Sequence, residues 1–128
     1  MQNAKLRLLD GWGREMENII ETKSFDFAVR IVNLYKFLCE KNEFVMSKQL
    51  LRCGTSIGAN VAEAQKAQTT ADFNAKMNIA LKEANETSYW LRLLKHTDYL
   101  NEIEYKSVFA DNKEILALLT AICKKTNI

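Results

Sequence analysis

The residues that interrupt helices are almost missing from this chain, and their absence constrains the fold more than any other feature. The 128 residues include no proline and only four glycines, at positions 11, 13, 54 and 58. A β-protein needs turn residues at short intervals between its strands, so their near absence from the links favours long helices. The sequence predicts an all-α protein.

Apolar residues recur with the period of an α-helix in the first half of the chain. The stripe of a first helix consists of Phe27, Ile31, Leu34 and Leu38. We expect Thr22 or Ser24 to cap this helix and Asn42 to mark its end. A second helix is expected to run from an N-cap at Ser47 to about Ala67. Its apolar face consists of Leu50, Gly54, Ile57, Val61 and Ala64.

The second half of the chain shows two more helical patterns. A third helix is expected to begin at Thr69 or Thr70, with Asp72 in its first turn, and to reach Thr97. Its apolar face consists of Phe73, Met77, Ala80, Ala84, Leu91 and Leu94. A fourth helix begins near Asn101. Its seam consists of Tyr105, Phe109, Leu116, Leu119 and Cys123, with Ile115 and Ile122 beside it.

The links between these helices are short, which forces neighbouring helices to be antiparallel. The sequence therefore predicts an antiparallel up-down-up-down four-helix bundle over residues 21–128. Residues 1–20 are less periodic and hold Gly11 and Gly13 around Trp12. We interpret them as an N-terminal tail or a short extra segment.

Composition argues against a membrane protein and a disulfide framework, while charge alone does not decide whether nucleic acid is bound. The net charge of +2 and the pI near 8.4 lie below the pI above about 9 of a dedicated nucleic-acid-binding domain. No apolar run approaches the ~20 residues of a membrane span, and the first residues lack the apolar stretch of a secretion signal. Cys39, Cys53 and Cys123 are odd in number and far apart, which fits reduced thiols. We therefore expect a cytoplasmic protein that contacts no membrane.

Catalytic and metal-binding patterns are also missing from the sequence. A di-iron bundle needs Glu-x-x-His on two helices, whereas this chain has one histidine, His96, with Leu93 three residues before it. The cysteines stand alone rather than in the local pairs of zinc sites, and no glycine-rich phosphate loop follows a strand. The spacing of Gly54 and Gly58 instead favours close packing of two helices. We expect no enzyme activity, no catalytic residue, no metal and no cofactor.

A line of polar residues follows the shoulder of the second helix, within the stretch CGTSIGANVAEA. Its functional interpretation is a shared polar site with carboxylates of the third helix. Its structural interpretation is a set of hydrogen bonds and ion pairs that fixes the register of the bundle. The set consists of Arg52, Ser56, Asn60, Glu63, Glu83 and Glu86. No base, nucleophile or metal set accompanies these residues, which favours the structural interpretation.

Two stretches, SKQLLRCGTSIGANVAEA and DFNAKMNIALKEANETSYWLRLL, make the chain resemble a known family, the 23S rRNA-intervening sequence proteins. The counterparts of the first family motif are Arg52, Ser56, Ile57, Asn60, Val61, Ala62 and Glu63. Those of the second are Asp72, Phe73, Glu83, Glu86, Tyr89, Trp90 and Leu91. The resemblance covers about residues 20–125. The chain departs from the family pattern at Cys53, at Val61 and at Ala64. Many members have glycine at the position of Ala64, so this last departure predicts a helix that continues toward Gln68.

The resemblance implies a four-helix bundle without enzymatic activity. Some members are encoded inside sequences that interrupt bacterial large-subunit rRNA genes. A related accessory protein of diversity-generating retroelements forms a five-fold ring that engages nucleic acid and a reverse transcriptase. The resemblance therefore implies a homo-oligomer, with a pentamer favoured, and possible association with RNA or DNA.

Two hypotheses about function follow. In the first, basic residues from three helices meet at one end of the bundle and hold phosphates. These residues are Lys36, Lys41, Lys48, Arg52, Arg92, Lys95 and His96. In the second, the protein is an interaction scaffold that docks a protein partner through exposed aromatic residues. Its anchors would be Tyr89, Trp90, Tyr99 and Tyr105. A third alternative is an enzyme with a site between subunits around Asn60, Glu63, Glu83 and Glu86.

Overall fold

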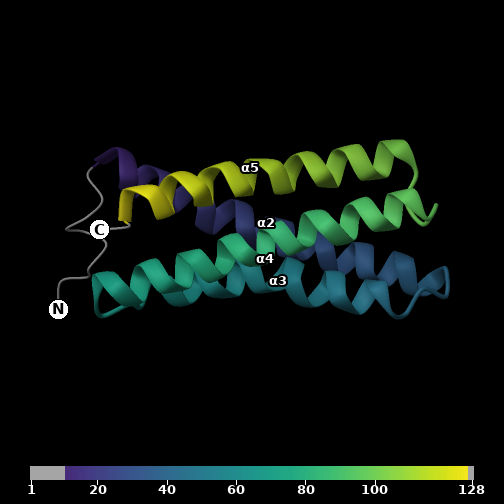
Figure 1. The fold of residues 1–128 in the computed structure, drawn as a ribbon, viewed down its shortest axis with the longest axis horizontal. Coiled ribbons are helices and arrows are strands. Elements are labelled where there is room, and N and C mark those ends of the chain that lie inside the picture. Colours follow the sequence, from purple (N-terminus) through teal and green to yellow (C-terminus); the bar gives the residue numbers. More distant parts are fainter. Residues whose placement is uncertain (1–10, 127–128) are drawn as a thin grey trace.

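Four long helices make up the fold. The computed structural model describes residues 11–126. The helices are α2 (Gly11–Glu40), α3 (Met46–Ala64), α4 (Thr70–His96) and α5 (Glu102–Thr126), and short links make each antiparallel to the next (Figure 1). The predicted all-α four-helix bundle is confirmed. No helix in the described part of the chain is long and apolar enough to cross a membrane.

Helix α2 begins earlier than its clearest apolar repeat. Residues 11–20, expected to belong to a tail, are helical, and Met16 and Ile20 are buried in the core. Residues 1–10 of the expected tail lie outside the described residues. Thr22 and Ser24 do not cap the helix, because their hydroxyls donate to the carbonyl oxygens of Asn18 and Glu21 within it. The expected cap is wrong because the buried apolar stripe continues toward the N-terminus, with Ile20 about one turn and Met16 about two turns before Ser24.

Helix α3 is capped by a residue that the sequence pattern did not single out. The buried carboxylate of Glu43 accepts hydrogen bonds from the backbone N–H groups of Val45, Met46 and Ser47, at 3.2, 3.1 and 2.6 Å. Ser47 was expected to be the N-cap, but it lies inside the helix and donates to the Glu43 carbonyl oxygen. The helix ends at Ala64, so the expected continuation to about Ala67 and toward Gln68 is wrong.

The starts of the last two helices agree with prediction. Thr69 is the N-cap of α4, and its hydroxyl accepts from the N–H of Asp72 at 3.0 Å. Before α5, the Asn101 side chain accepts from the N–H of Glu104 at 2.8 Å, and the Glu104 carboxylate accepts from the N–H of Asn101 at 2.9 Å. This reciprocal pair is a capping box, which satisfies two of the N–H groups that a helix start leaves unpaired.

The apolar stripes of the helices meet in one core, with the predicted faces of α3 and α4 fully inside it. The seam of α5 is rotated from the predicted one. Tyr105, Phe109 and Leu116 are only half-buried at its edge. The buried residues of α5 are Val108, Asn112, Ile115, Leu119, Ile122, Cys123 and Thr126. The prediction placed the aromatic residues Tyr105 and Phe109 at the centre of the buried face, whereas they lie at its edge.

Gly54 and Gly58 bring α3 close to α2, as predicted. A Cβ atom at Gly54 would lie 2.8 Å from Cγ1 of Ile31, and one at Gly58 would lie 3.1 Å from the carbonyl oxygen of Ser24. The contact between α2 and α5, which closes the bundle, is the least extensive of the four contacts between neighbouring helices. The bundle therefore packs most tightly around α3 and most loosely between its first and last helices.

Candidate functional site

The polar seam between α3 and α4 is built around Arg52. One guanidinium nitrogen lies 3.5 Å from the Glu83 carboxylate, and the other pairs with Glu86. The indole N–H of Trp90 also donates to the Glu86 carboxylate, at 3.0 Å. Arg52 Nε donates to the Gln49 side chain at 3.4 Å. The carboxylates of this seam are thus already engaged by a cation and an indole from the same chain.

A buried thiol lies directly beneath this ion pair. The Thr87 hydroxyl donates to the Glu83 carbonyl oxygen at 2.8 Å and contacts Cys53 Sγ at 3.3 Å. Desolvation raises the pKa of the Cys53 thiol to about 11. A thiol with so high a pKa stays protonated near neutral pH, so Cys53 is a packing residue rather than an activated nucleophile.

The other members of the predicted polar line do not join Arg52. The Asn60 amide donates to the carbonyl oxygen and to the hydroxyl of Ser56, at 2.9 and 3.1 Å, one turn earlier on the same helix. Glu63 pairs instead with Lys76 of α4 at 3.2 Å. The predicted set therefore divides into three separate local pairings along the seam.

Asn112 introduces a polar group into the core between α4 and α5. Its amide nitrogen donates to the Ala84 carbonyl oxygen at 2.9 Å and to the Ser88 hydroxyl at 2.8 Å. Its Oδ1 atom is buried without a hydrogen-bond partner. These directional contacts favour one register between the two helices, which is the structural role expected of buried polar groups in helical assemblies.

The basic residues at one end of the bundle are only partly available to a ligand. Lys41 donates to the Tyr99 carbonyl oxygen at 3.3 Å and lies 4.6 Å from the centre of the Phe37 ring. Lys95 pairs with Glu102 at 3.0 Å, and this contact lowers the pKa of the Glu102 carboxyl.

The remaining predicted phosphate contacts differ in how far they are neutralised. Arg52 is neutralised in the polar seam by Glu83 and Glu86. By contrast, Lys36, Lys48 and Arg92 make no ion pair with another described residue. His96 at the end of α4 contacts the Arg92 carbonyl oxygen through Nδ1, at 2.8 Å. The structure thus leaves three of the predicted cations with uncompensated charge.

Of the four aromatic residues expected to anchor a partner, Tyr89 is the exposed one. Tyr89 is exposed, whereas Trp90 is half-buried. Tyr99 and Tyr105 are also half-buried against the core. Sequence reasoning missed Phe25, which is 68% exposed, and its neighbour Val29 one turn further on α2. The sequence does contain a pattern for these exposed residues, because Phe25, Val29 and Val32 form a second apolar stripe at i, i+4 and i+7.

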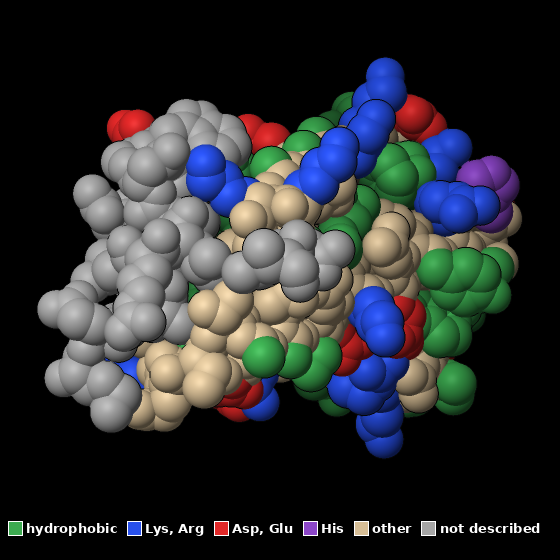
Figure 2. All heavy atoms as spheres, turned by 60° about the vertical axis from the view of Figure 1, so that its left-hand side comes forward, with side chains coloured by type: hydrophobic (Ala, Val, Ile, Leu, Met, Phe, Trp, Pro, Cys, Tyr) green, Lys and Arg blue, Asp and Glu red, His purple; other side chains and the backbone are tan. Residues whose placement is uncertain are grey.

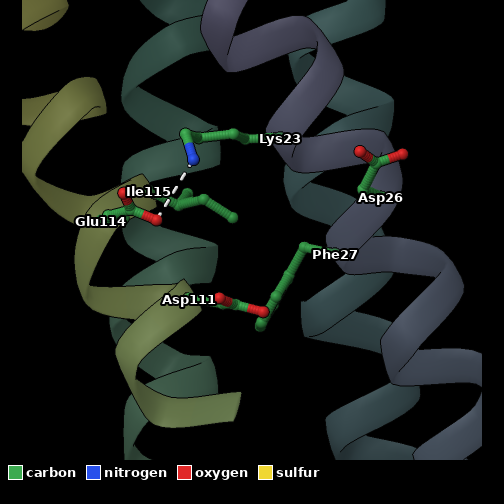
Figure 3. A pocket seen from close by; sticks show the side chains of 6 residues that line it. All are labelled: Lys23, Asp26, Phe27, Asp111, Glu114 and Ile115. Atoms are coloured by element: carbon green, nitrogen blue, oxygen red, sulfur yellow. Dashed lines mark hydrogen bonds and ion pairs between the residues drawn. The ribbon is translucent and has the colours of Figure 1, made fainter. Parts of the chain in front are cut away.

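A cleft of about 200 Å³ opens between α2 and α5 (Figure 3). Its charged groups are largely matched, since Lys23 pairs with Glu114 at 3.2 Å and Arg30 pairs with Asp111 at 2.7 Å. Figure 3 shows Asp26 on α2, with its carboxylate turned away from the Lys23–Glu114 pair. Within residues 11–126, no group of three His, Cys, Asp or Glu side chains is arranged to hold a metal ion.

Comparisons with known proteins agree with the architecture. The family model of the 23S rRNA-intervening sequence protein matches residues 16–121. A crystal structure from Bacteroides thetaiotaomicron, described as a protein with unknown function from the S23 ribosomal protein family, is 60% identical to this chain, with a TM-score of 0.84. The match covers 85% of this chain and 98% of that chain. A search of curated proteins finds no match.

The family model spans the four helices from Met16 in α2 to Ala121 in α5, and therefore includes the polar seam and the close contact at Gly54 and Gly58. The matched range thus contains the residues that pair α3 with α4 and those at the close contact of α3 with α2. The chain belongs to the family of 23S rRNA-intervening sequence proteins.

Proposed function

We propose that this chain is a non-catalytic protein that assembles into a homo-oligomeric ring in the cytoplasm and associates with RNA or DNA. The observation that carries the association with nucleic acid is the uncompensated charge of Lys36, Lys48 and Arg92. Most of the other cations predicted to bind phosphate are engaged within the protein. Exposed basic side chains without acidic partners attract phosphate groups. The family's name, which refers to 23S rRNA, supports the same direction.

The arrangement of the polar seam supports a role without catalysis. A general base must be within hydrogen-bond reach of a substrate proton and be free to accept it. Glu83 and Glu86 instead face Arg52, and the Trp90 indole N–H donates to the same Glu86 oxygen that contacts Arg52. The buried thiol beneath them has a raised pKa. These groups hold α3 against α4.

Self-assembly is supported by the exposed apolar residues of α2. Phe25 and Val29 lie beside the close contact between α2 and α3, where Gly58 approaches the backbone at Ser24. Ala59 and Ala62 are two small exposed residues of α3 close in sequence to Gly58. Exposed apolar surface of this kind marks protein interfaces. The resemblance to a ring-forming relative favours five copies of the chain.

Light scattering in solution tests the assembly. The wild-type chain is expected at a multiple of its 14.7 kDa mass, and Phe25→Ser is expected to shift the protein toward the monomer. Ile103→Ser is a matched control, because Ile103 is 81% exposed on α5, away from this surface. A wild-type monomer at micromolar concentration would contradict the proposed assembly.

Titration of a labelled, structured RNA across a salt series tests the association with nucleic acid. Binding is expected at low salt, with affinity falling steeply as salt rises, because neutralised phosphates release counterions. A ring of several copies would strengthen a weak contact through avidity. Absence of binding at low salt, or binding without salt dependence, would contradict the proposal.

The second candidate function is a protein-interaction scaffold, favoured by the exposure of Tyr89 at the surface of α4. Tyr89, Arg92, Leu93 and His96 line a shallow cleft of about 180 Å³ on this helix. Affinity purification with and without nuclease distinguishes the two candidates. A partner held through nucleic acid is lost after nuclease treatment, whereas a directly docked protein stays bound.

A further inference from the structure

The outward side of α5 carries an unbroken line of exposed residues without a carboxylate. The line follows the positions i, i+4, i+7, i+11, i+14 and i+18, which lie on one side of a helix. It consists of Lys106, Ala110, Lys113, Ala117, Thr120 and Lys124, all exposed. At 1.5 Å per residue, the three lysines span about 27 Å along the helix. None of the three forms an ion pair with another described residue.

The carboxylates in the body of α5 lie on its other side, toward α2. Asp111 and Glu114 pair with Arg30 and Lys23 of α2. Glu104 lines a groove of about 260 Å³ together with residues of α2. Asp111 and Glu114 are therefore paired with cations of α2 and do not neutralise the lysines of the outward line.

The carboxylates of α4 are likewise turned away from α5, toward α3. Glu83 and Glu86 face Arg52 of α3. Asp72 stands eleven residues before Glu83, which places it on the same side of the helix. Most acidic groups of α4 and α5 thus lie in the two seams with α3 and α2, and Glu102 remains on the side where α4 and α5 adjoin.

A second pair of cations flanks this side on α4. Asn74 donates to Thr126 of α5 at 2.9 Å, and Ser88 accepts from Asn112 of α5. Arg92 lies one turn beyond Ser88, so it shares the side of α4 that faces α5. Lys82 lies one turn beyond Asn78, whose amide in turn bonds to Asn74. Both cations lack an ion-pair partner among the described residues.

We call this surface the α4–α5 face and define its cations as Lys82, Arg92, Lys106, Lys113 and Lys124. Glu102 is the carboxylate that the described residues place on it, and it is paired with Lys95. Figure 2 shows blue Lys and Arg side chains along the upper part of the molecule, where α5 lies, and beside the purple histidine. Tan, which marks the backbone and the remaining side chains, fills the centre of the same view.

We infer that the α4–α5 face is the surface on which this protein holds the sugar-phosphate backbone of a nucleic acid, without reading its sequence. This inference rests on the proposed association with nucleic acid and names the surface that performs it. Lysine is a flexible point charge that contacts phosphate without the planar geometry used to read bases. Asparagine and hydroxyl groups between the cations can hydrogen-bond sugar and phosphate oxygens without adding charge.

The chemistry of the face favours nucleic acid over an anionic membrane. A helix that binds a membrane surface combines basic residues with bulky apolar residues that enter the lipid. The exposed line of α5 instead places Ala110, Ala117 and Thr120 between its lysines. With four or five phosphates neutralised per chain, the slope of log K against log salt is expected near about −4.

Two triple variants locate the binding surface. In the first, Lys106→Gln, Lys113→Gln and Lys124→Gln remove the cations of the outward line on α5. In the matched control, Lys23→Gln, Lys66→Gln and Lys76→Gln remove equal charge from positions outside this face, in α2, in the turn that follows α3 and in the seam of α4 with α3. The probes are a labelled RNA hairpin and a DNA duplex of the same stem sequence. Far-ultraviolet circular dichroism and thermal unfolding confirm that both variants keep the fold.

The α5 variant is expected to bind both probes at least about tenfold more weakly than wild type at low salt, with a salt slope reduced by about 3. The control is expected to stay near wild type. A loss in the control alone would overturn the assignment of the face but leave the proposed function standing, and an equal loss in both variants would do the same. Wild-type protein that binds neither probe, or that binds vesicles of anionic phospholipid in their place, would overturn both.

Discussion

At the scale of single residues, burial controls the chemistry of two thiols. Desolvation raises the pKa of Cys53 and of Cys123 from 9.0 to about 11. We expect iodoacetamide at about pH 8 to modify both thiols far more slowly in the folded protein than in urea, because the thiolate is the reacting species. Mass spectrometry of peptides measures each rate. Equal rates for Cys53 in the folded and unfolded protein would contradict its assignment as a packing residue.

The same raised pKa values make stability depend on alkaline pH. Between pH 9 and about 11, the unfolded chain loses these protons while the folded chain keeps them. Fewer protons on the unfolded state lower the free energy of unfolding as pH rises. The contribution of the protonated thiols is therefore fully present below pH 9 and declines above it.

Gly54 is the residue whose substitution tests the close contact between α2 and α3. Alanine gains about 1 kcal/mol of helix propensity over glycine. Its Cβ, however, would lie 2.8 and 2.9 Å from the two γ carbons of fully buried Ile31. Overpacking of this kind costs about 1–3 kcal/mol. We expect Gly54→Ala to lower the free energy of unfolding in urea, and a more stable variant would contradict the tight contact.

At the scale of helices, Glu43 sets where α3 begins. Its buried carboxylate accepts from three successive N–H groups, so Glu43→Ala is expected to cost about 1–2 kcal/mol of the free energy of unfolding. Glu40→Ala, at an exposed position on the end of α2, is the control. Urea denaturation measures both variants. Equal stability of the two would show that the cap contributes nothing.

The polar seam gives a second comparison between helices. Glu86→Ala removes the partner of Arg52 and of the Trp90 indole, and is expected to cost about 1 kcal/mol. Glu63→Ala removes only an exposed ion pair with Lys76, and such pairs contribute about 0–1 kcal/mol. Thermal unfolding that ranks Glu63→Ala as the more damaging change would contradict the structural role of the seam.

The four helices could be predicted because their periodicity and turn chemistry agree. Thr69 and Asn101 were recognisable as caps, since short polar side chains before an apolar stripe are the usual helix start. The start of α2 was obscured, because Gly11 and Gly13 interrupt the pattern before Met16. The cap of α3 was missed because Glu43 reaches the helix from outside it, which helix propensity does not describe.

The candidate site was only partly predictable for a geometric reason. Arg52, Glu83 and Glu86 meet because antiparallel helices place their shoulders side by side. Glu63 stands eleven residues beyond Arg52, about 16 Å along α3, so it faces a different part of α4. A helical pattern predicts on which side of its helix a residue lies, but not which residue of the neighbouring helix it contacts. The pairing of Lys95 with Glu102, and hence its partial loss as a phosphate contact, was invisible for the same reason.

At the scale of the whole molecule, the net charge of +2 conceals a strong separation of charge. The seams α3–α4 and α2–α5 collect most of the ion pairs between helices. On the face shared by α4 and α5, Lys82, Arg92, Lys113 and Lys124 have no ion-pair partner among the described residues. Glu102 pairs with Lys95, and the charge of Lys106 also lowers the pKa of the Glu102 carboxyl. A field of one sign on one surface governs association with charged partners more than total charge does. The mildly basic composition therefore does not show where exposed positive charge collects on the surface.

The most direct test of this account is the reactivity of individual lysines in the wild-type protein. Brief acetylation with and without a saturating RNA hairpin, followed by peptide mass spectrometry, measures protection at each position. We expect Lys106, Lys113 and Lys124 to be protected by the RNA, while Lys66, which lies outside this face, keeps its reactivity. Unchanged reactivity along α5 under conditions where the RNA is bound would contradict the assignment of the α4–α5 face.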